Sequence, residues 1–268
     1  MRRLLLLLMV MLLSRFAVYA QPTAYQSKTQ YQKAQLDAVS IDLPYSEDLA
    51  DQTIKDYMGK KGLKGASQKG YTLYHGIRLG DTASAMSDLL FKTDRRNRDK
   101  NASTVTLLVV MAGEDPAKRA PGAPFPVEDA KVFLNNLIPA FVAADLELQI
   151  QAQEIVIKKA QKKYNGLRDD QSDLEKKIRN AQSDLDQNKK DQTQATADMQ
   201  ANIHGDNDAM KKAQKKENKL LDEQSSLEKK IRNWQASLAQ NNTDQASAKT
   251  DLQNQQQSLD SMKAKRKG

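Results

Sequence analysis

The sequence predicts an α+β protein with two parts, a small N-terminal domain and a long antiparallel α-helical coiled-coil hairpin. Three observations predict this fold class. Apolar residues are concentrated before residue 150, strand and helix patterns alternate in that part, and residues 158–200 return as residues 211–253 with 27 of the 43 aligned positions identical. Repeats at a fixed period indicate paired or stacked structural units rather than an enzyme pocket.

The first twenty residues have the pattern of a secretory signal peptide. Arg2 and Arg3 precede an apolar run over residues 4–13, and residues 18–20 place small side chains at the positions that a signal peptidase reads. The run is too short to span a bilayer, which takes about 20 apolar residues. We therefore expect cleavage near Ala20, a periplasmic or secreted protein, and no transmembrane segment in the mature chain.

The net charge limits the class of partner, and the cysteine count limits the source of stability. The chain carries +8, and loss of Arg2, Arg3 and Arg15 with the signal leaves 8 − 3 = +5. Such mild basicity favours weak attraction to an anionic envelope surface, and we expect no nucleic-acid partner. Because the chain has no cysteine, stability has to come from packing rather than from disulfides.

The segment 21–125 reads as a small mixed α/β domain. A polar lead-in runs to about Ser27, and Ser46 is a good N-cap for a helix that ends near Gly59. Alternating or apolar runs predict strands at residues 34–43, 70–79, 84–93 and 103–112, the last central because it is almost continuously apolar. With the helix that follows, the expected order is β-α-β-β-β-α.

A proline-rich linker separates this domain from the helical region at 126–268. Residues 113–126 hold four of the seven prolines, which excludes regular structure there. An amphipathic helix is predicted from Val127, with Ala130, Phe133, Leu137, Phe141 and Val142 on one side. Pro139 should kink it before it continues into the repeats.

The two repeat copies carry the heptad pattern of a coiled coil. The apolar seam is predicted at Leu174, Ile178 and Leu185 in the first copy and at Leu227, Ile231, Trp234 and Leu238 in the second. Residues 203–207 should break the helix, with Gly205 as the hairpin turn. One register sets Leu185 against Leu227, Ile178 against Trp234 and Gln192 against Leu220.

Polar seam residues are the candidates to specify that register, either within the hairpin or with a second molecule. They are Gln171, Asn188, Gln192, Gln224, Asn241 and Gln245. Because badly paired polar groups weaken a seam by about 1 kcal/mol or more each, a dimer or trimer formed through the helices is also expected.

Residues that could carry chemistry are sparse. The two histidines, His75 and His204, cannot form a multi-histidine metal site, and we expect each to be a surface or capping residue. We expect no catalytic residues, no metal and no cofactor. A basic turn is the one candidate contact for an anionic partner, and it consists of Lys92, Arg95, Arg96, Arg98 and Lys100.

The leading hypothesis is therefore an exported, non-enzymatic structural or interaction protein of the cell envelope, with the hairpin as a spacer or oligomerisation element. In general architecture, a basic exported body with a long helical hairpin resembles the trimeric periplasmic chaperones with helical tentacles. That resemblance implies the alternative, a holdase-type chaperone that binds unfolded envelope proteins. A third class is an enzyme that uses carboxylates of the N-terminal domain.

Overall fold

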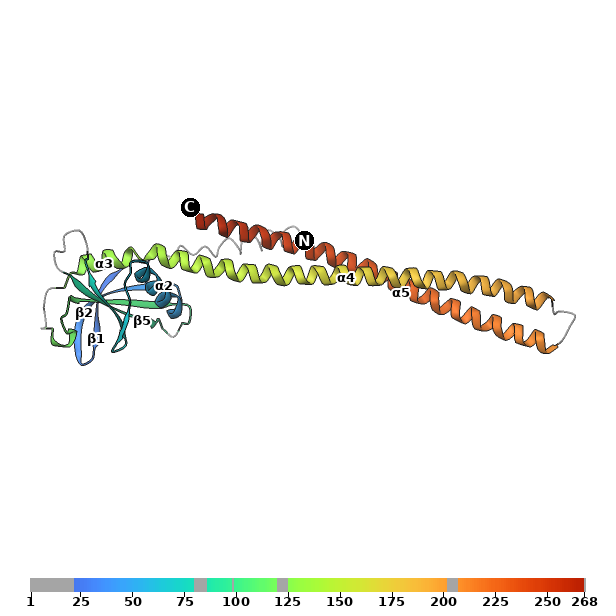
Figure 1. Cartoon of the computed structure of the whole chain (residues 1–268), viewed down its shortest axis with the longest axis horizontal. Helices are drawn as coiled ribbons and strands as arrows, with labels where there is room; N and C mark the ends of the chain where they lie inside the picture. Colours follow the sequence, from blue (N-terminus) through green and yellow to red (C-terminus); the bar gives the residue numbers. More distant parts are fainter. Residues whose placement is uncertain (1–21, 80–85, 98, 120–124, 202–206, 268) are drawn as a thin grey trace, which may run out of the picture. The chain divides into compact units, whose positions relative to one another are not determined.

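Six strands in the first half of the chain form one sheet, accompanied by helices, so the predicted α+β class is confirmed (Figure 1). The computed structural model describes residues 22–79, 86–97, 99–119, 125–201 and 207–267. Two compact units divide the chain: residues 1–148, here called the body, and residues 149–268, here called the helical unit. The expected signal peptide, residues 1–20, lies outside the described residues.

The sheet is antiparallel throughout, in the order β1-β2-β6-β5-β4-β3. Strand β6 lies between β2 and β5, and most of its side chains are buried, as its apolar sequence predicts. The strands are β1 Tyr25–Tyr31, β2 Ala34–Leu43, β3 Ala66–Gln68, β4 Tyr71–Ile77, β5 Ser87–Arg95 and β6 Ser103–Met111.

Two edge strands are missing from the sequence prediction. The predicted polar lead-in, which ends at about Ser27, contains the first residues of strand β1, and β1 pairs with β2 from Tyr25↔Ser40 to Tyr31↔Ala34. Strand β3 is three residues long and pairs only with β4. Both strands expose most of their side chains. In β1 the alternate residues Ser27, Thr29 and Tyr31 are half-buried or buried, but two of these three are small polar residues, so the sequence lacks the apolar alternation of a half-buried strand. Before α3, the strands and the α-helix of the described residues follow in the order β1-β2-α2-β3-β4-β5-β6. The sequence predicted one strand before the helix and three strands after it.

Helices α2 (Glu47–Lys60) and α3 (Val127–Asn135) pack against one face of the sheet. The Ser46 hydroxyl accepts a hydrogen bond from the Leu49 amide at 3.3 Å, which caps α2 as predicted. The ring of Phe133 lies 6.3 Å from Tyr57 and 6.2 Å from Phe91, measured between centroids, and so joins α3 to α2 and to β5. Burial of these apolar groups is the main force that holds the helices on the sheet.

The other face of the sheet carries a second apolar cluster: Tyr31, Leu36, Tyr71, Leu73, Leu90, Leu108 and Val110. Strands at opposite ends of the sheet meet over this cluster through their side chains. Thr29 Oγ1 lies 2.6 Å from the Tyr71 hydroxyl, and Gln68 Nε2 donates to the Tyr31 hydroxyl at 2.9 Å. The sheet therefore curls until β1 contacts β3 and β4, which buries much of this face. Ala117 of the short 3-10 helix η1 (Pro116–Lys118) also packs against the cluster, so the expectation of no regular structure in residues 113–126 was wrong at this point.

Two long helices complete the chain, α4 (Ile138–Ala201) and α5 (Asn207–Lys267). The kink expected at Pro139 appears as a two-residue interruption, Asn136 and Leu137, between α3 and α4, because proline has no N–H to continue the helical ladder. Leu137 and Phe141 are fully buried in the body, whereas Val142 is 51% exposed and does not share their face. Among the described residues, no helix has the length and apolar character needed to cross a membrane.

Candidate functional site

Polar side chains join α4 to α5 inside the helical unit. Gln153 Nε2 donates to Gln255 Oε1 at 2.6 Å, and Lys263 Nζ lies 2.7 Å from Glu154 Oε1. Nearer the other end of α4, Gln192 bonds to Gln224. Early residues of α4 thus pair with late residues of α5, so the two helices run antiparallel where these bonds form.

Four residues form a set that we call clamp 1: Asn188, Gln192, Leu220 and Gln224. The Gln192 amide Nε2 lies 2.6 Å from Asn188 Oδ1, 2.7 Å from Gln224 Oε1 and 3.3 Å from the Leu220 carbonyl oxygen. The two N–H groups of one side-chain amide therefore serve one acceptor on their own helix and two on the facing helix, with one N–H shared between two acceptors.

The same arrangement occurs a second time, and we call it clamp 2: Asn241, Gln245, Leu167 and Gln171. Gln245 Nε2 lies 2.7 Å from Asn241 Oδ1, 2.7 Å from Gln171 Oε1 and 3.1 Å from the Leu167 carbonyl oxygen. Each residue of clamp 2 is the repeat equivalent of a residue of clamp 1. The pair of helices thus has an internal two-fold relation, which exchanges the two repeat copies.

The clamps satisfy polar groups that are largely removed from water. Asn188 is 5% exposed and Asn241 is 8% exposed. A buried hydrogen-bonding group without a partner costs about 1–3 kcal/mol. A shift of one helix past the other would keep the bonds within each helix but break the bonds that Gln192 and Gln245 make to the facing helix. Polar seam residues of this kind specify register and orientation. All six polar seam residues named from the sequence belong to the two clamps.

The predicted apolar seam lies between and beside the clamps. Ile178 and Ile231 are each 8% exposed. The other five predicted seam residues, Leu174, Leu185, Leu227, Trp234 and Leu238, are half-buried. Gly205, the predicted turn, lies outside the described residues.

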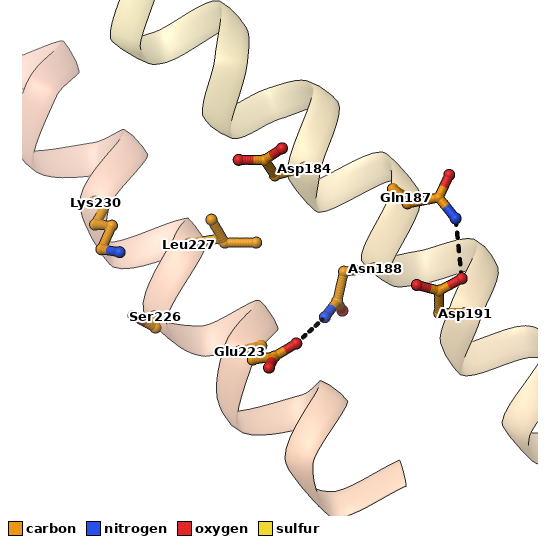
Figure 2. Close-up of a pocket in the computed structure, with 8 residues that line it drawn as sticks. All are labelled: Asp184, Gln187, Asn188, Asp191, Glu223, Ser226, Leu227 and Lys230. Atoms are coloured by element: carbon orange, nitrogen blue, oxygen red, sulfur yellow. Dashed lines mark hydrogen bonds between the residues drawn. The ribbon is translucent and has the colours of Figure 1, made fainter. Parts of the chain in front are cut away.

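A groove runs along the flank of clamp 1 between the two helices (Figure 2). Its volume is about 350 Å³, and Figure 2 shows Asn188 reaching from α4 toward Glu223 of α5, with Nδ2 and Oε2 3.5 Å apart. A groove of about 370 Å³ that includes Asn241 flanks clamp 2 and is lined largely by the repeat equivalents. Most of the carboxylates in both grooves are exposed, and such groups keep a helix surface soluble.

The basic turn lies at the end of the β5–β6 hairpin in the body, and three of its cations have acidic neighbours. Lys92 lies 2.8 Å from Asp94. Arg95 Nε lies 3.1 Å from Glu47, and Arg96 lies 3.5 Å from Asp42. Lys100 is exposed, and Arg98 lies outside the described residues. An anionic partner would have to compete with these carboxylates.

The sequence did not reveal a buried carboxylate, Asp88, which lies in β5 opposite a bulge in β4. The bulge falls between Tyr74 and Ile77 and includes Gly76 at φ +70°. Asp88 accepts hydrogen bonds from the amides of Gly76 at 3.0 Å and Gly113 at 3.1 Å, and its Oδ2 lies 2.9 Å from His75 Nδ1.

Asp88 therefore holds together three separate segments of the body. Burial alone would raise the pKa of Asp88, but the Gly113 and Gly76 amides and the His75 imidazole lower it below the ordinary value of 3.8. The His75 side chain is 66% exposed, as expected for a surface histidine. A hollow of about 190 Å³ adjoins this cluster and has Leu73, Leu90 and Val110 in its lining.

Comparison with known proteins finds no family model that matches the chain, and no curated protein matches it. In the part of the chain that the structure describes, no three histidine, aspartate or glutamate side chains gather in a way that could hold a metal ion. The most elaborate arrangement of polar side chains is the pair of clamps.

Replacing the central amide of either clamp should weaken the helical unit to the same degree. We expect Gln192→Ala and Gln245→Ala each to lower the free energy of unfolding by about 1–3 kcal/mol, because each leaves buried carboxamide oxygens without a donor. Urea unfolding followed by far-UV circular dichroism measures this. Gln187→Ala, which removes an exposed bond within α4, is the control, with an expected cost of about 0.5 kcal/mol or less. A large effect at one clamp and none at the other would contradict their equivalence.

The Asp88 carboxylate should stabilise the body in a pH-dependent way. Because its folded pKa is lowered, its contribution is present above the ordinary value of 3.8 and is lost as the pH falls through the folded pKa. We expect Asp88→Asn to destabilise the body by about 1–3 kcal/mol at neutral pH, since an amide nitrogen then faces a backbone N–H.

Urea titrations of both proteins, carried from neutral pH to below 3.8, should show the difference shrinking at the acid end. Asp94→Asn, which alters an exposed pair with Lys92, is the control and should leave stability nearly constant. A gap between the wild type and Asp88→Asn that stays constant across the whole range would rule out a lowered pKa at Asp88.

Proposed function

We propose that this chain is an exported, non-enzymatic structural protein of the cell envelope, in which α4 and α5 form an antiparallel coiled-coil hairpin that acts as a spacer. The observation that carries the proposal is the pair of equivalent clamps. Their amides are satisfied within one chain, so the polar seam does not require a second molecule. Each repeat copy spans 43 residues, which at 1.5 Å per residue gives an arm of roughly 65 Å.

The use of the polar side chains supports a structural role. The interior amides of the helical unit hold one helix against the other, and Asp88 joins strands of the body. The chaperone alternative needs apolar side chains presented along the helical arms. The predicted seam side chains are instead buried or half-buried. Ile155, Val156 and Leu221 lie outside that seam and are 42–56% exposed, so the preference for the spacer rests on the paired seam and not on an absence of exposed apolar groups.

Spin labels on both arms test the hairpin directly in the full chain, which has no native cysteine. Gln161→Cys and Asp251→Cys are exposed positions that the clamp register places at the same level of α4 and α5. Because packed helices lie about 8–10 Å apart, we expect a label separation of about 10–20 Å. Helices that do not pair would place the labels many tens of ångströms apart. The short distance should persist when labelled chains are diluted with unlabelled ones, since it arises within one molecule.

Export is tested separately by expressing the full chain in a Gram-negative host. The n-region charges and the short apolar run predict that the mature protein begins at Gln21. N-terminal sequencing of the protein recovered from the periplasm or medium checks this. Arg2→Glu with Arg3→Glu should retain the uncleaved chain in the cytoplasm. A full-length, cytoplasmic wild-type protein would overturn the envelope assignment and leave the hairpin untouched.

A further inference from the structure

The seams of the two repeat copies are almost interchangeable. From Leu167 to Ala195, every seam position of the first copy carries the same residue as its equivalent between Leu220 and Ala248, with one exception. The exception is Ala181, whose equivalent is Trp234. Between these limits the two seams therefore differ at one position, where a small apolar side chain in α4 is replaced by the largest one in α5.

This duplication means that each copy is complementary to itself. If α4 of one molecule met α4 of another in antiparallel orientation, Gln192 would face a second Leu167 and a second Gln171. That is the set of partners that Gln245 has in clamp 2. The clamps fix register and direction, but they cannot distinguish α5 from α4 of a second copy.

The exception lies at the centre of the two-fold relation, midway between the clamps. Counting inward from Gln192 and Leu220 in clamp 1 brings Ala181 level with Ile231, and Ile178 level with Trp234. Ala181 is 4% exposed, and Ile178 and Ile231 are each 8% exposed. This central region is therefore packed, and it receives one alanine and one tryptophan when α4 pairs with α5.

We propose that Ala181 and Trp234 select the partner of each helix, favouring α4 with α5 over pairing with the same helix of a second copy of this chain. The inference rests on the proposed hairpin. Pairing of α4 with α4 would bring two alanines to the centre and leave a void, which is costly in a packed layer. Pairing of α5 with α5 would bring two tryptophans into the same space and overpack it. Only the pair of α4 with α5 places one alanine and one tryptophan in the central layer, which fills it without a void and without overpacking.

Four full chains test the selection: the wild type, Ala181→Trp, Trp234→Ala and the double exchange. Either single change makes the two copies alike at this position, so pairing with a second copy becomes as well packed as pairing within the chain. Sedimentation equilibrium should show the dimerisation constant rising about tenfold or more for each single variant, since void and overpacking costs exceed a factor of ten. The double exchange carries the tryptophan to its two-fold equivalent, opposite Ile231, and should return the constant to the wild-type value.

Leu227→Ala is the matched control, because Leu227 and its equivalent Leu174 are identical in the two copies. It weakens pairing within the chain and between copies alike, so it should lower the urea midpoint and leave the dimerisation constant within about twofold of the wild type. Equal constants in all four chains, or a double exchange that dimerises as the single variants do, would overturn the selection. If the constants are equal while the spin-label distance between positions 161 and 251 is short in the wild type, the selection is overturned and the hairpin stands. If that distance is not short, the hairpin itself is overturned.

Discussion

The need to satisfy buried carboxamides governs the helical unit. An apolar seam alone tolerates sliding, because one leucine packs on another at several offsets. Clamp 1 and clamp 2 do not tolerate it, since each central amide, Gln192 or Gln245, has acceptors on both helices at 2.6 to 3.3 Å. A shift by one turn would break the interhelical hydrogen bonds of both clamps at once. Two fixed points along a pair of helices determine direction as well as register.

The body meets a comparable constraint by a different means. Helices cover one face of its sheet, and the curling of the sheet buries much of the other face. The curled sheet contains a bulge in β4 and tight turns at the ends of strands. The carboxylate of Asp88 accepts hydrogen bonds from the amides of Gly76, at the bulge in β4, and Gly113, which follows β6. Both glycines have positive φ, a conformation in which other residues are strained. The charge that stabilises these bends is buried only because three donors surround it.

Local patterns in the sequence predicted the features that are determined by residues close together in the chain. The apolar run at residues 103–112 marked the central strand β6, Ser46 marked the start of α2, and the heptads marked the seam. The polar seam residues were recognised as register candidates, but nothing in their spacing indicated that one glutamine would bridge both helices. Long-range partners of this kind were missed, those of Asp88 among them, because nothing in the sequence signals that Asp88 contacts Gly113, which lies 25 positions further along the chain. Strand β1 was missed because its inward-facing positions include the polar residues Ser27 and Thr29, so its burial alternates while its hydropathy does not.

Duplication explains why direction and partner choice need separate devices. Copying a segment copies its clamps, so the new helix fits the old one in antiparallel orientation without further change. The same copying allows α4 to pair with α4, and α5 with α5, of another molecule. Residues that are identical in the two copies cannot distinguish these pairs from the pair of α4 with α5. A residue that differs between the copies is required. Its effect is largest at the two-fold centre, because pairing of α4 with α4 would place two copies of Ala181 in one layer, and pairing of α5 with α5 would place two copies of Trp234 there. Ala181 and Trp234 occupy that place, and their difference in volume is the form of asymmetry to which a packed layer responds most strongly.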